Sequence, residues 1–287
     1  MQQKADPRLL VMDHEKNIGA TQSFNLFFKD SPEPYASILE DDNWWEPDFL
    51  EKMVCTMKQF PTVQVAWANM RVWKEGEDGG WTDTGTTIWP WSGVEKPELF
   101  YWPHRRQIMS ALHSNGAMMF RTREARNYAT PPETPFILTE ALRERSYPHP
   151  ILQVPQPLAH FSLTRDSARS GDRATWIQAQ VLLVGSFFKN VHPGDSTLQQ
   201  VWQEARSGPA KSIVTLILAA LSIRSCRYIL KFATMGDWMY FVAFCFKRPL
   251  VCLRALRAVF LHKGSWEFLD RHTARRVEES GMRGRTL

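Results

Sequence analysis

The sequence has few cysteines and no apolar run long enough to cross a membrane as a helix. Its four cysteines show no C-x-x-C spacing, so they predict neither a zinc site nor a disulfide framework. The uncharged apolar stretches at residues 212–223 and 238–246 have twelve and nine residues, whereas a spanning helix needs about 20. Residues 1–8 are polar and predict no secretory signal. These absences favour a protein that faces the cytosol.

What is present is a globular composition with an uneven charge. The 287 residues are 44% hydrophobic and 23% charged, which is enough for a substantial core. Residues 210–287 hold fourteen Lys/Arg and five Asp/Glu, which gives this tail a net charge of +9. Because the whole chain has a net charge of +5, the remaining residues have a net charge of −4. We expect a main domain at 1–207 and a basic helical region at 208–287. Such a tail predicts an anionic partner, either nucleic acid or anionic lipid.

The N-terminal part of the sequence predicts a parallel β-α-β unit. Residues 9–12 and 35–39 are short apolar runs typical of buried strands, and residues 22–29 between them fit a helix. This interpretation places the acidic cluster Glu40-Asp41-Asp42 at the C-terminal end of a strand, where open α/β sheets bind ligands.

The middle of the chain predicts further alternating elements. Residues 49–60 show apolar positions at helical spacing, and residues 63–67 alternate as in a half-buried strand. Eight of the twelve tryptophans lie between Trp44 and Trp102, which suggests an irregular aromatic lobe. The elements predicted after it are a strand at 116–120, a helix at 138–145, a strand at 151–154 and helices to the end.

Three consecutive acidic residues concentrate negative charge in one loop. A divalent cation would offset this charge, and oxygen-only ligands suit magnesium or manganese. The same residues are also typical of a solvated loop, so the cluster alone does not decide between the two interpretations.

The surroundings of the cluster resemble the central segment of family 2 glycosyltransferases. NIGATQSFN (residues 17–25) matches the family's N-x-G with a further Asn six residues after the Gly, and LEDDNWWEP (39–47) matches its acidic DxD-type motif with Trp and Pro beyond. The resemblance implies a GT-A-like α/β fold, a partial Rossmann-like mixed sheet flanked by helices, with a C-terminal helical tail.

The same resemblance implies the donor site. Asn17, Gly19 and Asn25 match the family's spacing. Glu40 stands where the family usually has Asp, and Asp42 matches the second acid, so these two are the expected ligands of Mn²⁺ or Mg²⁺. Asp41 and Trp44 are expected to contact the nucleotide sugar, because Trp44 adjoins the acidic loop and offers an aromatic face.

Two later segments extend the resemblance. LTEALRER (138–145) resembles the family's later acidic motif, which makes Glu140 the expected base that deprotonates the acceptor. An exposed helix glutamate beside arginines is the alternative. PLAHFSLT (157–164) resembles the segment that ends the catalytic domain, so His160 is an expected third metal ligand. A hydrogen-bonded core histidine is the alternative there.

The family's domain usually opens with a strand-helix-strand segment that recognises the nucleotide base, and nothing before Asp6 could supply it. Three explanations stay open: a longer reading frame, completion by another chain, or lost activity. An incomplete sheet would expose an edge, so we expect poor solubility or association into a homo-oligomer. A stable monomer in size-exclusion chromatography would count against this.

The tail predicts contact with a membrane surface through residues 210–262. Lys247, Arg254 and Arg257 fall on one face of an otherwise apolar helix, the pattern of a helix that lies among lipid headgroups. We expect no nucleic-acid partner, since no nucleic-acid motif is present.

Taken together, the resemblance and the tail indicate an inverting, metal-dependent glycosyltransferase, cytoplasmic and peripheral at the inner face of the membrane. Its expected acceptor is an envelope or polysaccharide glycan, including a lipid-linked one. The alternative is an inactive transferase-like module that acts as a binding or assembly partner.

Overall fold

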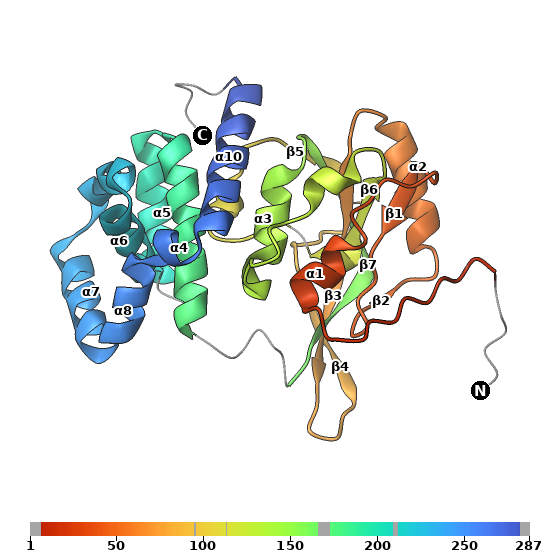
Figure 1. Cartoon of the computed structure of the whole chain (residues 1–287), viewed down its shortest axis with the longest axis horizontal. Coiled ribbons are helices and arrows are strands. Elements are labelled where there is room, and N and C mark those ends of the chain that lie inside the picture. Colours follow the sequence, from red (N-terminus) through yellow and green to blue (C-terminus); the bar gives the residue numbers. More distant parts are fainter. Residues whose placement is uncertain (1–6, 95, 113, 166–172, 209–211, 282–287) are drawn as a thin grey trace.

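The computed structural model describes residues 7–94, 96–112, 114–165, 173–208 and 212–281. Two lobes lie side by side (Figure 1): a sheet with its helices up to residue 165, and a bundle of helices from residue 173. Residues 1–6 of the predicted main domain lie outside the described residues. So do residues 209–211, at the start of the predicted basic region, and residues 282–287 at its end.

A mixed seven-stranded sheet forms the first lobe. Its order is β1-β6-β3-β7-β2, with β4 paired to β3 and β5 paired to β7. The central strands β3 and β7 run parallel, and the other pairs are antiparallel. The strands are β1 (Tyr35–Ser37), β2 (Trp44–Trp45), β3 (Val65–Glu75), β4 (Trp81–Thr87), β5 (Glu98–Phe100), β6 (Met118–Arg121) and β7 (Ile151–Leu163).

Helices flank this sheet, which confirms the predicted α/β class. α2 (Phe49–Gln59) confirms the helix predicted at 49–60, and its buried face of Phe49, Met53 and Met57 packs on the sheet because these residues recur every four positions. The remaining helices of this lobe are α1 (Ala20–Asn25) and α3 (Thr139–Ser146), with short 3-10 helices at Arg105–Ile108, Asn115–Ala117, Ala125–Tyr128 and Phe136–Leu138.

The predicted N-terminal β-α-β unit is wrong. Residues 9–12 form no strand, and their side chains are 45 to 79% exposed. A strand needs a partner for its backbone groups, and no described strand lies beside this segment. β1 pairs with β6 in the antiparallel sense, so the parallel connection is absent from the described residues.

The central strands are longer than the sequence pattern predicts. The stretch predicted as an irregular aromatic lobe contains a hairpin, because β3 continues to Glu75 and pairs with β4. β7, predicted at 151–154, continues to Leu163. Pro155 and Pro157 suggested its end, but they lie where the register with β3 shifts, and an irregular position in a ladder tolerates a residue without a backbone N–H.

Helices fill the second lobe, as predicted. The long helix α4 lies at its centre and contacts α6, α8 and α10. The helices are α4 (Arg173–Asn190), α5 (Asp195–Ser207), α6 (Ile213–Ser222), α7 (Met235–Lys247), α8 (Pro249–Leu256), α9 (Ala258–Leu261) and α10 (Lys263–Glu279), with a 3-10 segment at Arg224–Phe232. Among the described residues, no helix combines the length and apolar character needed to cross a bilayer.

The two lobes share contacts along α3 and α10. Arg276 of α10 is almost fully buried, and its Nη2 donates to the carbonyl of Ser146 at the end of α3 at 2.9 Å. The core of the helical lobe takes side chains from α4 and α5 as well as from the later helices. Helical packing therefore begins at Arg173, upstream of the boundary predicted at 207.

Candidate active site

The acidic cluster forms a turn between β1 and β2 that is anchored to β7. The side-chain Nδ2 of Asn43 donates to Glu40 Oε2 at 2.5 Å. On the other side, the backbone N–H of Ser162 donates to Asn43 Oδ1 at 3.0 Å, and the Ser162 hydroxyl donates to the carbonyl of Asp42. Asp41 and Asp42 are exposed, while Glu40 is half-buried. The turn is therefore fixed, with two of its carboxylates open to solvent.

Glu40 is also pressed against the segment before β6. A Cβ added at Gly116 would lie 2.8 Å from Glu40 Oε2, so a side chain there would displace the Glu40 carboxylate. The Trp45 indole donates from Nε1 to the carbonyl of Gly116 at 2.6 Å and stacks on Phe49. These contacts hold the acidic turn beside residues 114–116.

Glu140 lies in the first turn of α3, and its carboxylate also contacts the segment of residues 114–116. Its Oε1 accepts hydrogen bonds from the Ser114 hydroxyl and from the backbone N–H of Asn115, both at 3.1 Å. Glu40 and Glu140 line one pocket of about 60 Å³, which is room for about two water molecules. Its lining is completed by Asn115, Phe136, Ile137, Thr139 and Trp176.

A buried cation stands behind this pocket. Arg143 is fully buried, and its guanidinium donates to Asn115 Oδ1 at 3.2 Å and lies over the ring of Phe28. Burial lowers the pKa of Arg143, while Tyr147, Glu140 and Glu40 act in the opposite direction. The two carboxylates of the pocket therefore share one positive neighbour.

Asn25, which stays a prediction as a donor contact, makes structural hydrogen bonds in this arrangement. Its Nδ2 donates to the carbonyl of Thr130 at 2.7 Å, and its Oδ1 accepts from the backbone N–H of Thr130 at 3.0 Å and from Arg143 at 3.3 Å. Because both ends of the amide are engaged, the side chain ties α1 to residue 130 and to Arg143.

Asn17 and Gly19 lie at the start of α1, apart from the pocket lining. The backbone N–H of Gly19 donates to Asn17 Oδ1 at 2.8 Å, and Gly19 has φ of +79°, a conformation that favours glycine. Both residues are exposed. With Asp41, they stay predictions as donor contacts, since they are not among the described residues that line the pocket.

His160, predicted as a metal ligand, is already fully engaged. Its Nδ1 accepts from the indole Nε1 of Trp73 at 2.8 Å, which leaves the proton on Nε2, 2.9 Å from Glu46 Oε1. Trp44 stacks on the imidazole with ring centroids 4.9 Å apart. No nitrogen lone pair is left for a metal, so in this arrangement His160 orients Trp44 and Glu46 rather than binding an ion.

A comparison with known protein families finds a match over the part of the chain that contains the acidic turn. Residues 1–123 match the family described as glycosyl transferase family 2. The match covers less than half of the chain and supports a family 2 glycosyltransferase domain there. The mixed sheet with flanking helices agrees with the GT-A-like α/β fold that this family has. No curated protein matches the chain.

The family match covers only part of the glycosyltransferase pocket. It includes the acidic turn and Asn115, and it ends before Glu140, Arg143 and Trp176. Sequence reasoning missed Arg143, although its position three residues after Glu140 puts both on one face of α3. Trp176 comes from the helical lobe, and no signal in the sequence connected it with the site.

Proposed function

We propose that this glycosyltransferase moves a sugar from a nucleotide-sugar donor at the acidic turn to an acceptor hydroxyl beside Glu140, with inversion. One observation carries the proposal: Glu40 and Glu140 come from segments far apart in the chain and line the same pocket. An acidic donor site and a base are thereby next to each other, as a direct displacement requires.

Glu140 acts as the general base in this proposal. The hydrogen bonds from Ser114 and Asn115 orient its carboxylate at the pocket wall. Glu140 takes the proton of the acceptor hydroxyl, the acceptor oxygen attacks the anomeric carbon, and the bond from that carbon to the diphosphate breaks. The nucleoside diphosphate leaves from the opposite face, so the configuration at the anomeric carbon inverts.

Glu40 and Asp42 fit a divalent metal ion that is shared with the donor. Mg²⁺ binds through one or two protein carboxylates and completes its shell with phosphate oxygens and water. The described residues hold no group of three or more His, Cys, Asp or Glu that could bind an ion, so a two-carboxylate site is the arrangement that fits. The ion would neutralise the charge of the departing diphosphate.

The test is metal-dependent donor binding by the Glu40→Gln variant. Replacing a ligand should weaken Mn²⁺-dependent binding of a nucleotide sugar by about 10- to 100-fold or more, because even residues that only orient a ligand have effects of this size. Titration calorimetry with UDP-, GDP- and dTDP-sugars, with Mn²⁺ or with EDTA, measures it.

The matched control is Glu51→Gln, since Glu51 is exposed on α2. Equal binding by both variants, or donor binding that EDTA leaves unchanged, would show that Glu40 holds no metal. Absence of donor binding by the unmodified chain would favour the inactive binding module instead.

We further propose that the helical lobe docks on the inner, cytoplasmic face of a membrane, where a lipid-linked or envelope glycan serves as acceptor. The helices α7, α8 and α9 carry an exposed apolar face, and its most exposed members are Phe246 at 84% and Phe260 at 82%. The other members of this face are Met235, Met239, Val242, Leu250, Leu253, Leu256 and Leu261.

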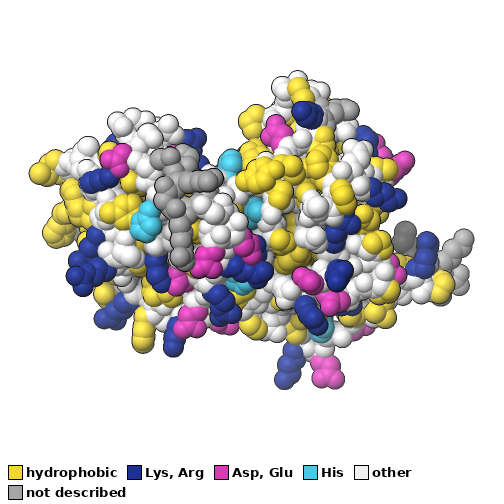
Figure 2. Space-filling model, turned by 90° about the horizontal axis from the view of Figure 1, so that it is seen from above, with side chains coloured by type: hydrophobic (Ala, Val, Ile, Leu, Met, Phe, Trp, Pro, Cys, Tyr) yellow, Lys and Arg dark blue, Asp and Glu magenta, His cyan; other side chains and the backbone are white. Residues whose placement is uncertain are grey.

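Charge supports a bilayer with anionic lipids as the partner of this face. Lys247, Arg248, Arg254 and Arg257 are exposed on the same helices, and residues 238–266 contain no Asp or Glu. Hydrophobic and basic side chains lie together at the end of the molecule formed by α7 and α8 (Figure 2). Each basic residue near an anionic surface contributes roughly 1 kcal/mol, in addition to the apolar insertion.

We expect Leu250→Asp to reduce binding to vesicles of phosphatidylcholine with phosphatidylserine by about tenfold or more. The substitution places a charge where an apolar side chain, 70% exposed, would enter the lipid. Leu50→Asp is the matched control, because Leu50 is 51% exposed on α2, away from this face. Co-sedimentation at low and high salt measures both variants. Binding that oligonucleotides compete away would indicate the nucleic-acid alternative.

A further inference from the structure

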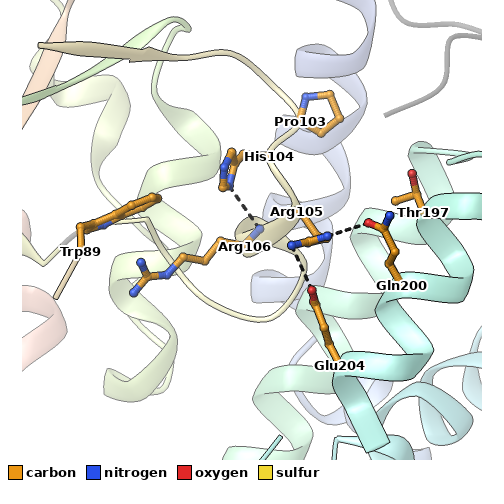
Figure 3. A pocket seen from close by; sticks show the side chains of 8 residues that line it. All are labelled: Trp89, Pro103, His104, Arg105, Arg106, Thr197, Gln200 and Glu204. Atoms are coloured by element: carbon orange, nitrogen blue, oxygen red, sulfur yellow. Dashed lines mark hydrogen bonds and ion pairs between the residues drawn. The ribbon is translucent and has the colours of Figure 1, made fainter. Parts of the chain in front are cut away.

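A second and larger cavity lies between the two lobes. It has a volume of about 540 Å³, within the usual range for ligand sites. One wall is the stretch from Pro103 to Arg106 with the neighbouring Trp89, and the other wall is α5 (Figure 3). Nothing in the proposed transfer mechanism uses this cavity.

Arg105 joins the two walls of the cavity. Its guanidinium bonds to Gln200 Oε1 at 2.7 Å and to Glu204 Oε1 at 3.0 Å, both on α5. Figure 3 shows these contacts as dashed lines across the cavity. The Glu204 carboxylate is therefore paired, and the positive charge left over in the lining is that of Arg106.

Arg106 is held in place by an aromatic ring, with the Glu144 carboxylate acting on its charge from farther away. Its guanidinium lies over the ring of Trp89, 4.5 Å from the ring centroid. Within the described part of the chain, this guanidinium makes no hydrogen bond to an acceptor, and Figure 3 shows it extended along Trp89. A planar fork of N–H donors fixed on an aromatic face is suited to carboxylate or phosphate oxygens.

His104 adds a second donor beside Arg106. The backbone N–H of Arg106 donates to His104 Nδ1 at 3.2 Å, so the neutral imidazole carries its proton on Nε2. Burial, with Arg106 and Arg105 nearby, lowers the pKa of His104 and keeps the ring neutral near pH 7. The cavity thus offers a cationic donor and a neutral donor to a ligand.

A short chain of contacts links this cavity to the transfer pocket. Trp89 Nε1 donates to the carbonyl of Leu112 at 2.7 Å. The backbone N–H of Leu112 donates to Glu144, which lies one helical turn after Glu140 on α3. Ser114 and Asn115, close behind Leu112 in the chain, bond to Glu140 itself.

We propose that this cavity binds the anionic group of a saccharide acceptor, a phosphate or carboxylate, through Arg106 and His104. The proposal rests on the proposed function, because it assigns the cavity to the acceptor of that reaction. The acceptor would then carry its negative charge away from the hydroxyl that reaches Glu140.

The test is direct binding of anionic sugars in the absence of donor. Glucose 1-phosphate and glucuronate should bind at least tenfold more tightly than glucose. Arg106→Gln should weaken both by about tenfold or more, because hydrogen bonds to a charged group contribute this much. Arg106→Lys, which keeps the charge but loses the fork, should recover only part of the affinity.

The matched control is Arg126→Gln, since Arg126 is exposed in another part of the sheet lobe, where it pairs with Asp30 at 3.7 Å. Titration calorimetry, with thermal melting to confirm that each variant is folded, provides the measurement. The proposal would be overturned if glucose bound as tightly as glucose 1-phosphate and glucuronate. It would also be overturned if Arg106→Gln left the affinity for these two anionic sugars unchanged. Inorganic phosphate that binds as tightly as glucose 1-phosphate would also overturn it, as it would indicate a simple anion site.

The same titration separates this proposal from the transfer mechanism. Glu140→Gln should keep the full affinity for glucose 1-phosphate, because Glu140 lines the other pocket. A chain that binds anionic sugars without transferring a sugar would contradict the mechanism alone. A chain that transfers without an Arg106-dependent preference would contradict the anion site alone.

Discussion

Glu140→Gln is expected to lower the rate of sugar transfer by roughly 10²- to 10⁴-fold, the usual contribution of a general base. The amide oxygen of glutamine can still accept from the Ser114 hydroxyl and the Asn115 N–H. The geometry of the pocket should therefore persist while the ability to take a proton is lost. Release of nucleoside diphosphate, measured with a membrane extract as the source of acceptor, gives the rate.

Donor binding distinguishes a lost base from a damaged site. The Mn²⁺-dependent affinity for the nucleotide sugar should stay within about threefold of the unmodified enzyme, because the donor is held by the acidic turn rather than by α3. Glu51→Gln on α2 should retain full activity. If Glu140→Gln transferred sugar at nearly the original rate, the base would have to be another group.

Glu144→Gln should lower the free energy of unfolding by about 3–5 kcal/mol, the typical result of leaving a buried charge without electrostatic compensation. Glu144 is 1% exposed and accepts hydrogen bonds from Gln107 Nε2 at 2.6 Å and from the Leu112 N–H. It is also the carboxylate that opposes the effect of burial on Arg145. That burial lowers the pKa of Arg145 to about 10.

The loss should be large because Arg145 has no other charge compensation among the described residues. Its Nε and Nη1 atoms are buried without hydrogen-bond partners, and only Nη2 donates, to the carbonyl of Gln107. Urea denaturation measures the change. Glu204→Gln is the control, since Glu204 forms an exposed ion pair with Arg105 and should change stability by less than about 1 kcal/mol. Equal losses in both variants would contradict this account of α3.

The sequence predicted those elements whose side chains follow one clear period. α2 was predicted almost to the residue, because Phe49, Met53 and Met57 recur at helical spacing on the buried face. β7 was predicted too short, because Pro155 and Pro157 normally end a strand, and the register shift against β3 that accommodates them cannot be read from one strand alone. Residues 9–12 have the pattern of a strand, but pairing depends on a neighbour that the pattern does not specify.

Those residues of the candidate site that lie in local motifs could be predicted from the sequence. The contacts between distant segments could not. The acidic turn and Glu140 both stood out by resemblance, and the structure places Glu40 and Glu140 in one pocket. The sequence did not reveal that Trp73 and Glu46, far from His160 in the chain, contact both of its nitrogens, an arrangement that favours the alternative of a hydrogen-bonded core histidine. Trp176 reaches the pocket only through the packing of the helical lobe, which no local pattern in a single sequence encodes.

With the helical lobe docked on a membrane as proposed, the hydrogen bonds from α10 to the end of α3 would limit which acceptors can react. Arg276 ties the helical lobe to Ser146, at the opposite end of the helix that carries Glu140. With α7 to α9 resting on lipid, the pocket would then stand at a fixed height above the bilayer. Only a glycan whose reactive hydroxyl reaches that height would be extended, so the folded lobe would select acceptors by length as well as by chemistry.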